Sequence, residues 1–297
     1  VTLANGDFYD EAADAHSADP AGPIKSFAWP LLLQAGGLAS MNANRLQLTH
    51  AGEHALTAPP QDTLRRLWQR WLPSRLLDEF NRIDRIRGQR TGRALTAAAP
   101  RRKVLAAALA DCPVGRWVAV EEFARYLQAE DFEFEVARDP WALYVCEREY
   151  GALGFAGYGD WPILQGRYLR AFLFEYAATL GLVDVAYVHP TEGPEDYRQI
   201  WGTDDYAFLS RYDGLEHFRL TALGAWCLGK SEHFAATATA GAARLEVLPS
   251  RRVRLVAGEL DEAQRLQLDA WAEREGEAAW KLTRETLLDA LERGLDP

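Results

Sequence analysis

The amino-acid sequence contains an internal repeat, and this feature constrains the fold more than any other. Two segments far apart in the chain of 297 residues, Leu46–Leu56 and Phe218–Leu228, share the pattern apolar-x-Leu-Thr-x-x-Gly-x-x-x-Leu. A repeated pattern of this kind predicts that one supersecondary unit occurs twice in the chain. Two dipeptides precede each copy: Gly-Leu (Gly37-Leu38 and Gly181-Leu182) and Trp-Pro (Trp29-Pro30 and Trp161-Pro162).

The residues of the repeat favour a definite order of elements. Proline suits the first turn of a helix, where its missing N–H group has no intrahelical partner to lose. Glycine suits the end of a helix, where the backbone turns left-handed. The apolar-x-Leu segment alternates as a short strand does, and Thr49 or Thr221 is a candidate N-cap for the helix that follows. The predicted unit is therefore a helix, a Gly-Leu turn, a β-ribbon and a threonine-capped helix.

This order resembles the winged helix-turn-helix family, whose sequences often carry a Leu-Thr-x-x-Gly segment after the wing. The elements predicted for the second copy are helices at Arg101–Ala110, Glu121–Gln128 and Gln165–Leu180, a strand at Arg116–Val120, and an enlarged wing formed by Val183–Val188 and Tyr206–Leu209. The helix at Gln165–Leu180 takes the place of the recognition helix. The resemblance implies that Arg167 and Arg170, near the start of that helix, contact DNA. The alternative is that the helix packs against tryptophan-rich partners.

The C-terminal segment resembles a second family. Arg244–Val256 is predicted to form a hairpin and Leu260–Glu275 a helix. The following Lys-Leu-Thr-Arg-Glu-Thr-Leu-Leu-Asp-Ala-Leu-Glu-Arg-Gly stretch predicts a helix that Thr283 caps and Gly294 ends. Together these features resemble the N-terminal-like domain of XPB helicases, which in bacteria occurs in helicase-associated proteins that also contain winged helices. The resemblance implies attachment to DNA-processing machinery.

The patterns predict a mostly α-helical protein with short β-ribbons, and the two resemblances imply tandem winged helix-turn-helix modules and a small α+β C-terminal domain. The expected segments are a first winged-helix module at residues 1–61, a helical connector with a basic loop at 62–100, a second winged-helix module at 101–232 and the XPB-like domain at 240–297. The 48% of apolar residues can form substantial cores. The chain begins at Val1 and not at methionine, which suggests a piece of a longer protein.

Charge is unevenly distributed along the chain. The 33 lysine and arginine residues stand against 43 aspartate and glutamate residues, a net charge of −10, whereas proteins that bind nucleic acid usually carry a basic surface. The stretch from Arg82 to Lys103 nevertheless contains a single acidic residue, Asp84. We predict DNA contacts from this stretch and from the recognition helix, through Arg82, Arg85, Arg87, Arg90, Arg93, Arg101, Arg102, Lys103, Arg167 and Arg170. The alternative is that some of these side chains pair with carboxylates, of which Asp78, Glu79 and Asp84 are near in sequence.

Two segments of the sequence match known catalytic motifs. Gly224–Ser231 matches the phosphate-binding P-loop, but its residues continue the predicted Thr221-capped helix, so that Gly229 is expected to end a helix. His50-Ala-Gly-Glu53-His54 matches the inverted zinc-protease pattern, although zinc needs three protein ligands and no third is evident at helical spacing.

The acidic clusters of the sequence do not indicate a catalytic site either. The clusters Glu121-Glu122, Glu130–Glu135 and Asp204-Asp205 lack the companion lysine of a nuclease and are expected to be solvated faces. We therefore predict a protein that is not an enzyme and holds neither cofactor nor metal. An enzyme that uses Lys230 or the His50 and His54 pair is the less favoured alternative.

The predicted function is that of a non-catalytic DNA-binding or docking module in a DNA-processing, helicase-associated system. Its expected partners are DNA and another protein of the complex, such as a helicase. The alternative is a scaffold for protein–protein interaction whose winged helices do not touch DNA, and the net charge favours that version. The longest apolar stretch, Phe27–Ala39, is shorter than a membrane span, and Cys112, Cys146 and Cys227 form no metal or disulfide pattern, so a cytoplasmic location is expected.

Overall fold

The computed structural model describes residues 20–56, 58–90, 94–155, 161–234, 243–260 and 262–293. The chain divides into two compact units, residues 1–234 (unit 1) and 235–297 (unit 2), and each is described by itself. The first three segments expected from the sequence, residues 1–232, all lie within unit 1. Arg93 and Gly294, both singled out from the sequence, lie outside the described residues.

The protein is α+β, and the prediction of a mostly α-helical fold is wrong. The described residues form nine α-helices and eleven strands in four small antiparallel sheets, about 41% helix and 18% strand. Several strands are only two or three residues long, and three of them pair with partners far away in the chain. Such short strands have no alternation long enough to distinguish them from loops, which is why periodicity did not reveal them.

The helices and strands have the following bounds. The α-helices are α2 (Lys25–Ala35), α3 (His50–Ala55), α4 (Pro60–Trp71), α5 (Ala98–Asp111), α6 (Val120–Ala129), α7 (Arg167–Ala171), α8 (Ala222–Cys227), α9 (Glu262–Trp271) and α10 (Arg284–Glu292). The strands are β1 (Ala39–Asn42), β2 (Arg45–Leu48), β3 (Ile86–Arg87), β4 (Trp117–Ala119), β5 (Tyr144–Val145), β6 (Val183–Tyr187), β7 (Leu215–Leu220), β8 (Arg244–Leu248), β9 (Arg252–Ala257), β10 (Glu273–Arg274) and β11 (Ala279–Lys281). The sheets are β1-β2, β3-β5, β4-β7-β6 and β10-β11-β9-β8.

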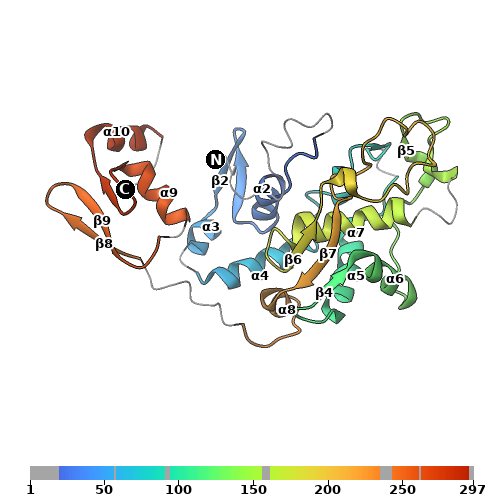
Figure 1. Ribbon diagram of the computed structural model, residues 1–297, viewed down its shortest axis with the longest axis horizontal. Coiled ribbons are helices and arrows are strands. Elements are labelled where there is room, and N and C mark those ends of the chain that lie inside the picture. The colour runs from blue at the N-terminus through green and yellow to red at the C-terminus, as the bar shows by residue number, and fades with distance from the viewer. Residues whose placement is uncertain are drawn as a thin grey trace. The chain divides into compact units, whose positions relative to one another are not determined.

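One long helix forms the core of unit 1. The π-helical turns η5 (Pro162–Gly166) and η6 (Phe172–Ala177) continue α7 at both ends, and we call the whole segment, Pro162–Ala177, the central helix. It runs through the middle of unit 1 in Figure 1. Almost every side chain along it is buried: most are apolar, and the charged Arg167, Arg170 and Glu175 are buried with them. The segment predicted as a recognition helix is therefore helical, but it is enclosed by the rest of unit 1.

Tryptophan side chains of α4 cover one side of the central helix. The Trp71 ring stacks on Tyr176 with centroids 4.9 Å apart and 14° between the planes. Trp68 meets Phe172 edge to face at 5.7 Å. Aromatic pairs in these arrangements add to the free energy gained from burying their area. Because α4 follows the first copy and the central helix belongs to the second, both copies share one hydrophobic core.

Both copies of the repeat fold into the same corner. The Thr49 hydroxyl accepts a hydrogen bond from the Gly52 amide (3.1 Å) and donates one to the Gly37 carbonyl (2.7 Å). The Thr221 hydroxyl does the same with Gly224 (2.9 Å) and Gly181 (2.8 Å). The threonine thus caps the helix after the ribbon and fastens it to the glycine that ends the helix before it.

The glycine of the Leu-Thr-x-x-Gly pattern is required by a close approach of two backbone segments. A Cβ atom on Gly52 would lie 2.0 Å from the Leu38 carbonyl oxygen, and one on Gly224 would lie 2.1 Å from that of Leu182. No residue with a side chain fits at such a distance without moving the backbone. The Leu-Thr-x-x-Gly pattern therefore indicates a contact between the capped helix and the turn that precedes the ribbon.

The two copies differ in the elements before and between the strands. The ribbon of the first copy turns through Ala43 and Asn44, whereas β6 and β7 are separated by residues 188–214. The second wing strand lies at Leu215–Leu220 and not at the predicted Tyr206–Leu209, because that segment joins an irregular loop that covers the core. Pro30 lies inside α2, but Pro162 begins the central helix, so the Trp-Pro dipeptides are not equivalent.

Unit 2 combines a four-stranded sheet with two helices. Trp280 of β11 is buried, and its Nε1 donates a hydrogen bond to Asp269 of α9 (2.6 Å). Thr283 caps α10, as the sequence predicts, and forms a capping box with Thr286. The hairpin predicted at 244–256 is found as β8 and β9, and the helix predicted at 260–275 is the shorter α9.

Candidate functional site

The arginine residues predicted to bind DNA lie mostly inside unit 1. Arg102 is fully buried, and its Nε donates a 2.6 Å hydrogen bond to Glu79, which is also buried. Its terminal nitrogens donate to three backbone carbonyl groups, those of Trp71 (2.8 Å), Ser74 (2.7 Å) and Leu77 (2.6 Å). This guanidinium group holds the loop after α4 against the start of α5, and it is not available to phosphates on the surface.

The carboxylate of Glu79 has a second partner on the central helix. The Tyr168 hydroxyl donates a hydrogen bond to Glu79 Oε2 (2.9 Å), so both carboxylate oxygens have donors. Burial raises the pKa of Glu79, and the neighbouring Arg102 opposes that shift. Burial also raises the pKa of Tyr168 well above its usual value. The three side chains form a closed polar cluster within an apolar core, where a missing partner is costly.

Arg82 binds the only acidic side chain of the central helix. Its Nε donates to both oxygens of Glu175, at 3.1 and 3.3 Å, and its Nη2 donates to the Pro23 carbonyl (2.7 Å). Burial raises the pKa of Glu175 to about 8, while the positive charges of Arg82 and Arg211 oppose the shift. Arg82 therefore links the basic stretch to the core.

The two arginines of the predicted recognition helix are bound in the same way. Arg167 is fully buried between Asp196 (2.5 and 2.6 Å) and Asp213 (3.0 Å). Arg170 forms a salt bridge with Glu121 of α6. Both guanidinium groups hold the surrounding loops and helices against the central helix, and neither faces solvent as a DNA-contacting side chain would.

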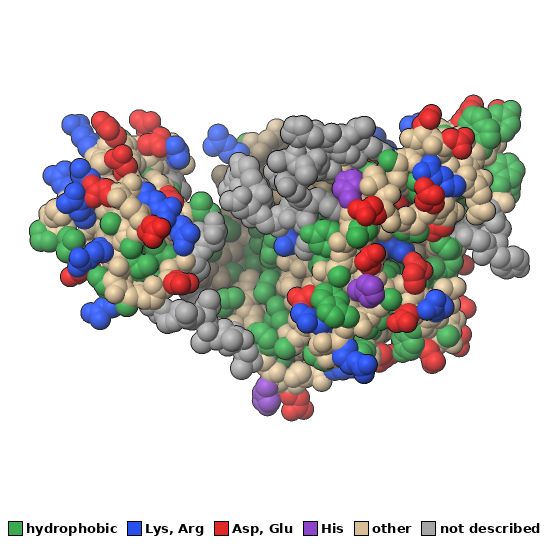
Figure 2. Space-filling view, viewed as in Figure 1, with side chains coloured by type: hydrophobic (Ala, Val, Ile, Leu, Met, Phe, Trp, Pro, Cys, Tyr) green, Lys and Arg blue, Asp and Glu red, His purple; other side chains and the backbone are tan. Residues whose placement is uncertain are grey.

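The other predicted contact residues have mixed environments. Arg101 is buried and paired with Asp78, and Arg85 donates to a backbone carbonyl in the loop before β7. Among the predicted residues that the structure describes, Arg87, Arg90 and Lys103 are exposed. On the face of unit 1 seen in Figure 2, basic and acidic side chains alternate and no continuous basic band is visible. The pairing with Asp78 and Glu79, considered from the sequence as the alternative, thus accounts for two of these arginines.

The P-loop-like segment forms a helix and its C-cap. Gly229 has a φ of +77°, and its amide donates to the Trp226 carbonyl (3.1 Å). The amides of Lys230 and Ser231 both donate to the Ala225 carbonyl, at 2.8 and 3.2 Å. A phosphate-binding loop needs free amide groups, and these amides already have partners.

The two histidines of the zinc-protease-like pattern contact each other on the surface. The Nε2 atoms of His50 and His54 lie 3.1 Å apart, and His50 Nδ1 lies 3.5 Å from Glu53. In the part of the chain that the structure describes, no three His, Cys, Asp or Glu side chains come together to hold a metal ion. The arrangement matches an exposed helix face.

The ribbon of the first copy has an apolar face that the described residues cover at one end, at Ala39, and leave uncovered over the rest. Met41 and Leu46 are directly opposite each other across β1 and β2, and Leu48 follows on the same face. Their side chains are 55%, 38% and 50% exposed. The opposite face carries Ser40, Asn42, Arg45 and Gln47. Alternation of this kind is typical of a ribbon with one buried face, so an uncovered apolar side is unusual.

The second copy shows how the same face is covered. Phe218 and Leu220, which correspond to Leu46 and Leu48 in the repeat, are fully buried. The strand β4 pairs with β7 and places Val118 opposite Phe218. The ring of Phe123, from α6, lies 5.1 Å from that of Phe218. A strand followed by a helix therefore completes the second copy, and nothing equivalent covers the first copy within the described residues. We call the uncovered face of Met41, Leu46 and Leu48 the open ribbon.

Comparisons with known families and curated proteins found no match, so the function is inferred from the structure. No model of a known protein family matches the chain, and a search of curated proteins found no similar sequence. Among the described residues, none of the helices has the length and the apolar composition needed to cross a bilayer. The open ribbon could not be found from the sequence, because Leu46 and Leu48 have the same pattern as their buried counterparts.

Proposed function

We propose that the chain is a non-catalytic docking module, and that it binds another protein through the open ribbon. The observation that supports this function is the difference between the two copies: one apolar face is covered by a strand and a helix, and its counterpart is exposed. The occupant that fits is a segment of another polypeptide that forms a strand followed by a helix, as β4 and α6 do. The resemblance to helicase-associated proteins suggests a DNA-processing complex as the setting.

The edge of β2 is suited to accept such a strand. In the second copy, the Gly115 amide donates a 2.8 Å hydrogen bond to the Leu220 carbonyl at the edge where β4 pairs. The corresponding carbonyl in the first copy is that of Leu48. Strand addition of this kind obtains affinity from backbone hydrogen bonds and specificity from alternate side chains. Apolar side chains opposite Leu46 and Leu48 would supply the specificity here.

A peptide taken from the chain itself can test this proposal. A labelled peptide of residues 113–130, which contains β4 and α6, is expected to bind the intact protein with a Kd of about 100 μM or tighter. Changing Leu46→Ser and Leu48→Ser together should weaken binding at least about tenfold, because each leucine loses an apolar contact with the peptide. Fluorescence anisotropy measures both affinities, and thermal unfolding should shift little because both side chains are exposed.

A matched control uses the polar face of the same ribbon. Asn42→Ser with Gln47→Ser removes two exposed side chains that contact each other at 3.0 Å, and it should leave peptide binding unchanged. Equal binding by the leucine variant would contradict the proposal. So would a dimer in sedimentation experiments that the leucine variant dissociates, because the occupant would then be a second copy of this chain.

Contact with DNA is a second candidate function, and one local observation favours it. Arg87 and Arg90 are both exposed and line a surface cavity of about 530 Å³. The acidic side chain in its wall, Asp84, is already bound by Arg211 at 2.5 Å. Two arginines beside a neutralised carboxylate can hold a phosphate group.

A salt titration tests this second function. Binding of labelled duplex DNA should weaken as salt rises, and changing Arg87→Ala and Arg90→Ala together should reduce the slope of log K against log salt by about 1.8. The control, Arg125→Ala with Arg148→Ala, removes the same charge at two other exposed positions. No binding at low salt, or the same slope in both variants, would exclude a DNA contact at Arg87 and Arg90.

A further inference from the structure

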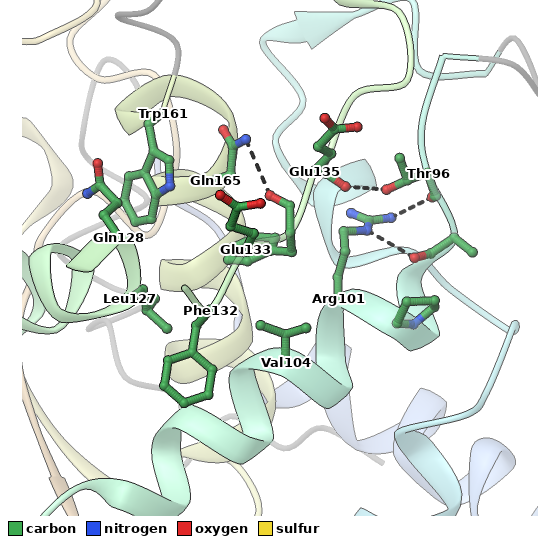
Figure 3. A pocket seen from close by; sticks show the side chains of 13 residues that line it. Thr96, Arg101, Val104, Leu127, Gln128, Phe132, Glu133, Glu135, Trp161 and Gln165 are labelled. Carbon is green, nitrogen blue, oxygen red and sulfur yellow. Dashed lines mark hydrogen bonds between the residues drawn. The ribbon is translucent and has the colours of Figure 1, made fainter. Parts of the chain in front are cut away.

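A cavity of about 640 Å³ lies at the surface of unit 1, where four segments meet. Its walls come from the start of α5, the end of α6, the loop at residues 132–135 and the beginning of the central helix. Figure 3 shows these side chains arranged around the opening, with Glu133 between Gln165 and Phe132. The acidic cluster Glu130–Glu135, expected from the sequence to be a solvated face, contributes Glu133 and Glu135 to this cavity. The other segments are far apart in the chain, so the sequence did not predict the cavity.

Aromatic rings form a large part of the wall. Phe132, Phe134 and Trp161 all line the cavity. Phe132 is packed against Tyr126, with centroids 5.7 Å apart, and Phe134 against Tyr168 at 5.8 Å. These contacts hold two of the rings in place without a ligand. The faces of aromatic rings attract cations, and more strongly where water is partly excluded.

The charge of the lining is negative. Glu133 and Glu135 are exposed at the cavity, and neither carboxylate has a salt bridge or hydrogen bond within the described part of the chain. The positive charge of Arg101, the cationic side chain in the wall, is paired with Asp78. A cleft of one sign of charge with apolar walls concentrates ligands of the opposite sign.

Two buried polar atoms in the lining have no partner among the described residues. They are Gln165 Oε1, an acceptor, and Arg101 Nη1, a donor. The Gln165 amide nitrogen donates to the Phe134 carbonyl (3.4 Å), which orients the group in the wall, as Figure 3 shows. Arg101 is only 1% exposed, and its other nitrogens donate to the carbonyls of Thr96 and Ala97. Unpaired buried polar atoms are uncommon, and here both belong to residues that line a cavity.

We propose that this cavity binds a lysine or arginine side chain of a peptide. The cationic group would interact with Glu133 and Glu135 and lie against the aromatic rings. The Gln165 Oε1 atom would accept a hydrogen bond from the cation, and Arg101 Nη1 would donate one to a carbonyl of the peptide backbone. This proposal does not depend on the open ribbon, which lies on other elements, so either one can fail without the other.

Short probes separate the parts of this proposal. In calorimetric titrations at low salt, acetyl-Gly-Arg-Gly-amide should bind at least about tenfold more tightly than acetyl-Gly-norleucine-Gly-amide, which has no charge. It should also bind more tightly than butylguanidine, which has the cation but no peptide carbonyl. Equal binding of butylguanidine would overturn the assignment to a peptide. Tighter binding of acetyl-Gly-Glu-Gly-amide would overturn the cationic site altogether.

Variants of the lining test the residues. Changing Glu133→Gln and Glu135→Gln together should weaken the arginine peptide about tenfold without changing thermal unfolding, since both side chains are exposed. The control, Glu130→Gln with Glu149→Gln, removes the same charge at exposed positions outside the lining and should change affinity less than twofold. An equal loss in both variants would show that overall charge, and not this cavity, attracts the peptide.

Discussion

Changing Arg102→Met is expected to lower the free energy of unfolding of unit 1 by about 3–5 kcal/mol. The change removes the donors to three backbone carbonyl groups and leaves the buried Glu79 without its positively charged partner, although the Tyr168 hydroxyl still donates to it. Removing one partner of a buried ion pair is costly because the other charge stays out of water without compensation. Urea unfolding, followed by tryptophan fluorescence, measures the loss.

The adjacent residue provides a control for Arg102. Lys103 is exposed, so Lys103→Met should change the free energy of unfolding by no more than about 0.5 kcal/mol. Adding Glu79→Met to Arg102→Met should restore part of the lost stability, because it removes the uncompensated carboxylate. If Arg102→Met proved as mild as Lys103→Met, the buried pair would not be a main support of the fold.

The second large effect concerns pH. The pKa of Glu175 is 4.5 in an unfolded chain and about 8 in the folded protein, because burial disfavours the charged form. Between these values the folded state binds more protons than the unfolded state, so the contribution of Glu175 to stability is fully present below pH 4.5 and is lost as pH rises toward 8. Burial also raises the pKa of Glu79 and Asp213, which act in the same direction.

The variant Glu175→Gln should remove most of this decline. Glutamine stays neutral and can still accept a hydrogen bond from Arg82. Between pH 5 and pH 8, the loss of unfolding free energy should therefore be smaller by about 3 kcal/mol in the variant than in the unchanged protein. Urea unfolding at pH 5, 6, 7 and 8 tests this, with Glu122→Gln as an exposed control. Parallel pH profiles in all three proteins would mean that Glu175 is ionised throughout.

The parts of the fold that the sequence predicted well depend on local chemistry. Three threonines cap helices because their hydroxyl groups accept hydrogen bonds from amides three residues ahead: Thr49, Thr221 and Thr283. This fixed spacing can be recognised in the sequence. Glycine is needed at position 52 because the backbone of α3 approaches the Leu38 carbonyl closely. The repeat shows the same glycine at Gly224, which approaches Leu182 in the same way. The predicted helix at Gln165–Leu180 was found for the same reason, since apolar spacing along one segment is visible in the sequence.

What could not be predicted depends on partners far away in the chain. Arg82 meets Glu175 across 93 residues and Arg167 meets Asp213 across 46, so no local pattern distinguishes these arginines from those that would face DNA. The pairing of Arg102 with Glu79 spans only 23 residues, and sequence proximity did suggest it. The same limit explains the fold class, because the short strands β3, β4 and β5 are defined by their pairing and not by their composition.

The contact between Trp71 and Tyr176 has a consequence for dissecting the protein. A truncation between residues 78 and 98 would separate α4 from the central helix and leave one ring of the stacked pair exposed on each fragment. The same cut would detach the carbonyl groups that Arg102 binds. Although the sequence repeats, the halves of unit 1 are thus expected to aggregate when expressed alone and to regain solubility when co-expressed.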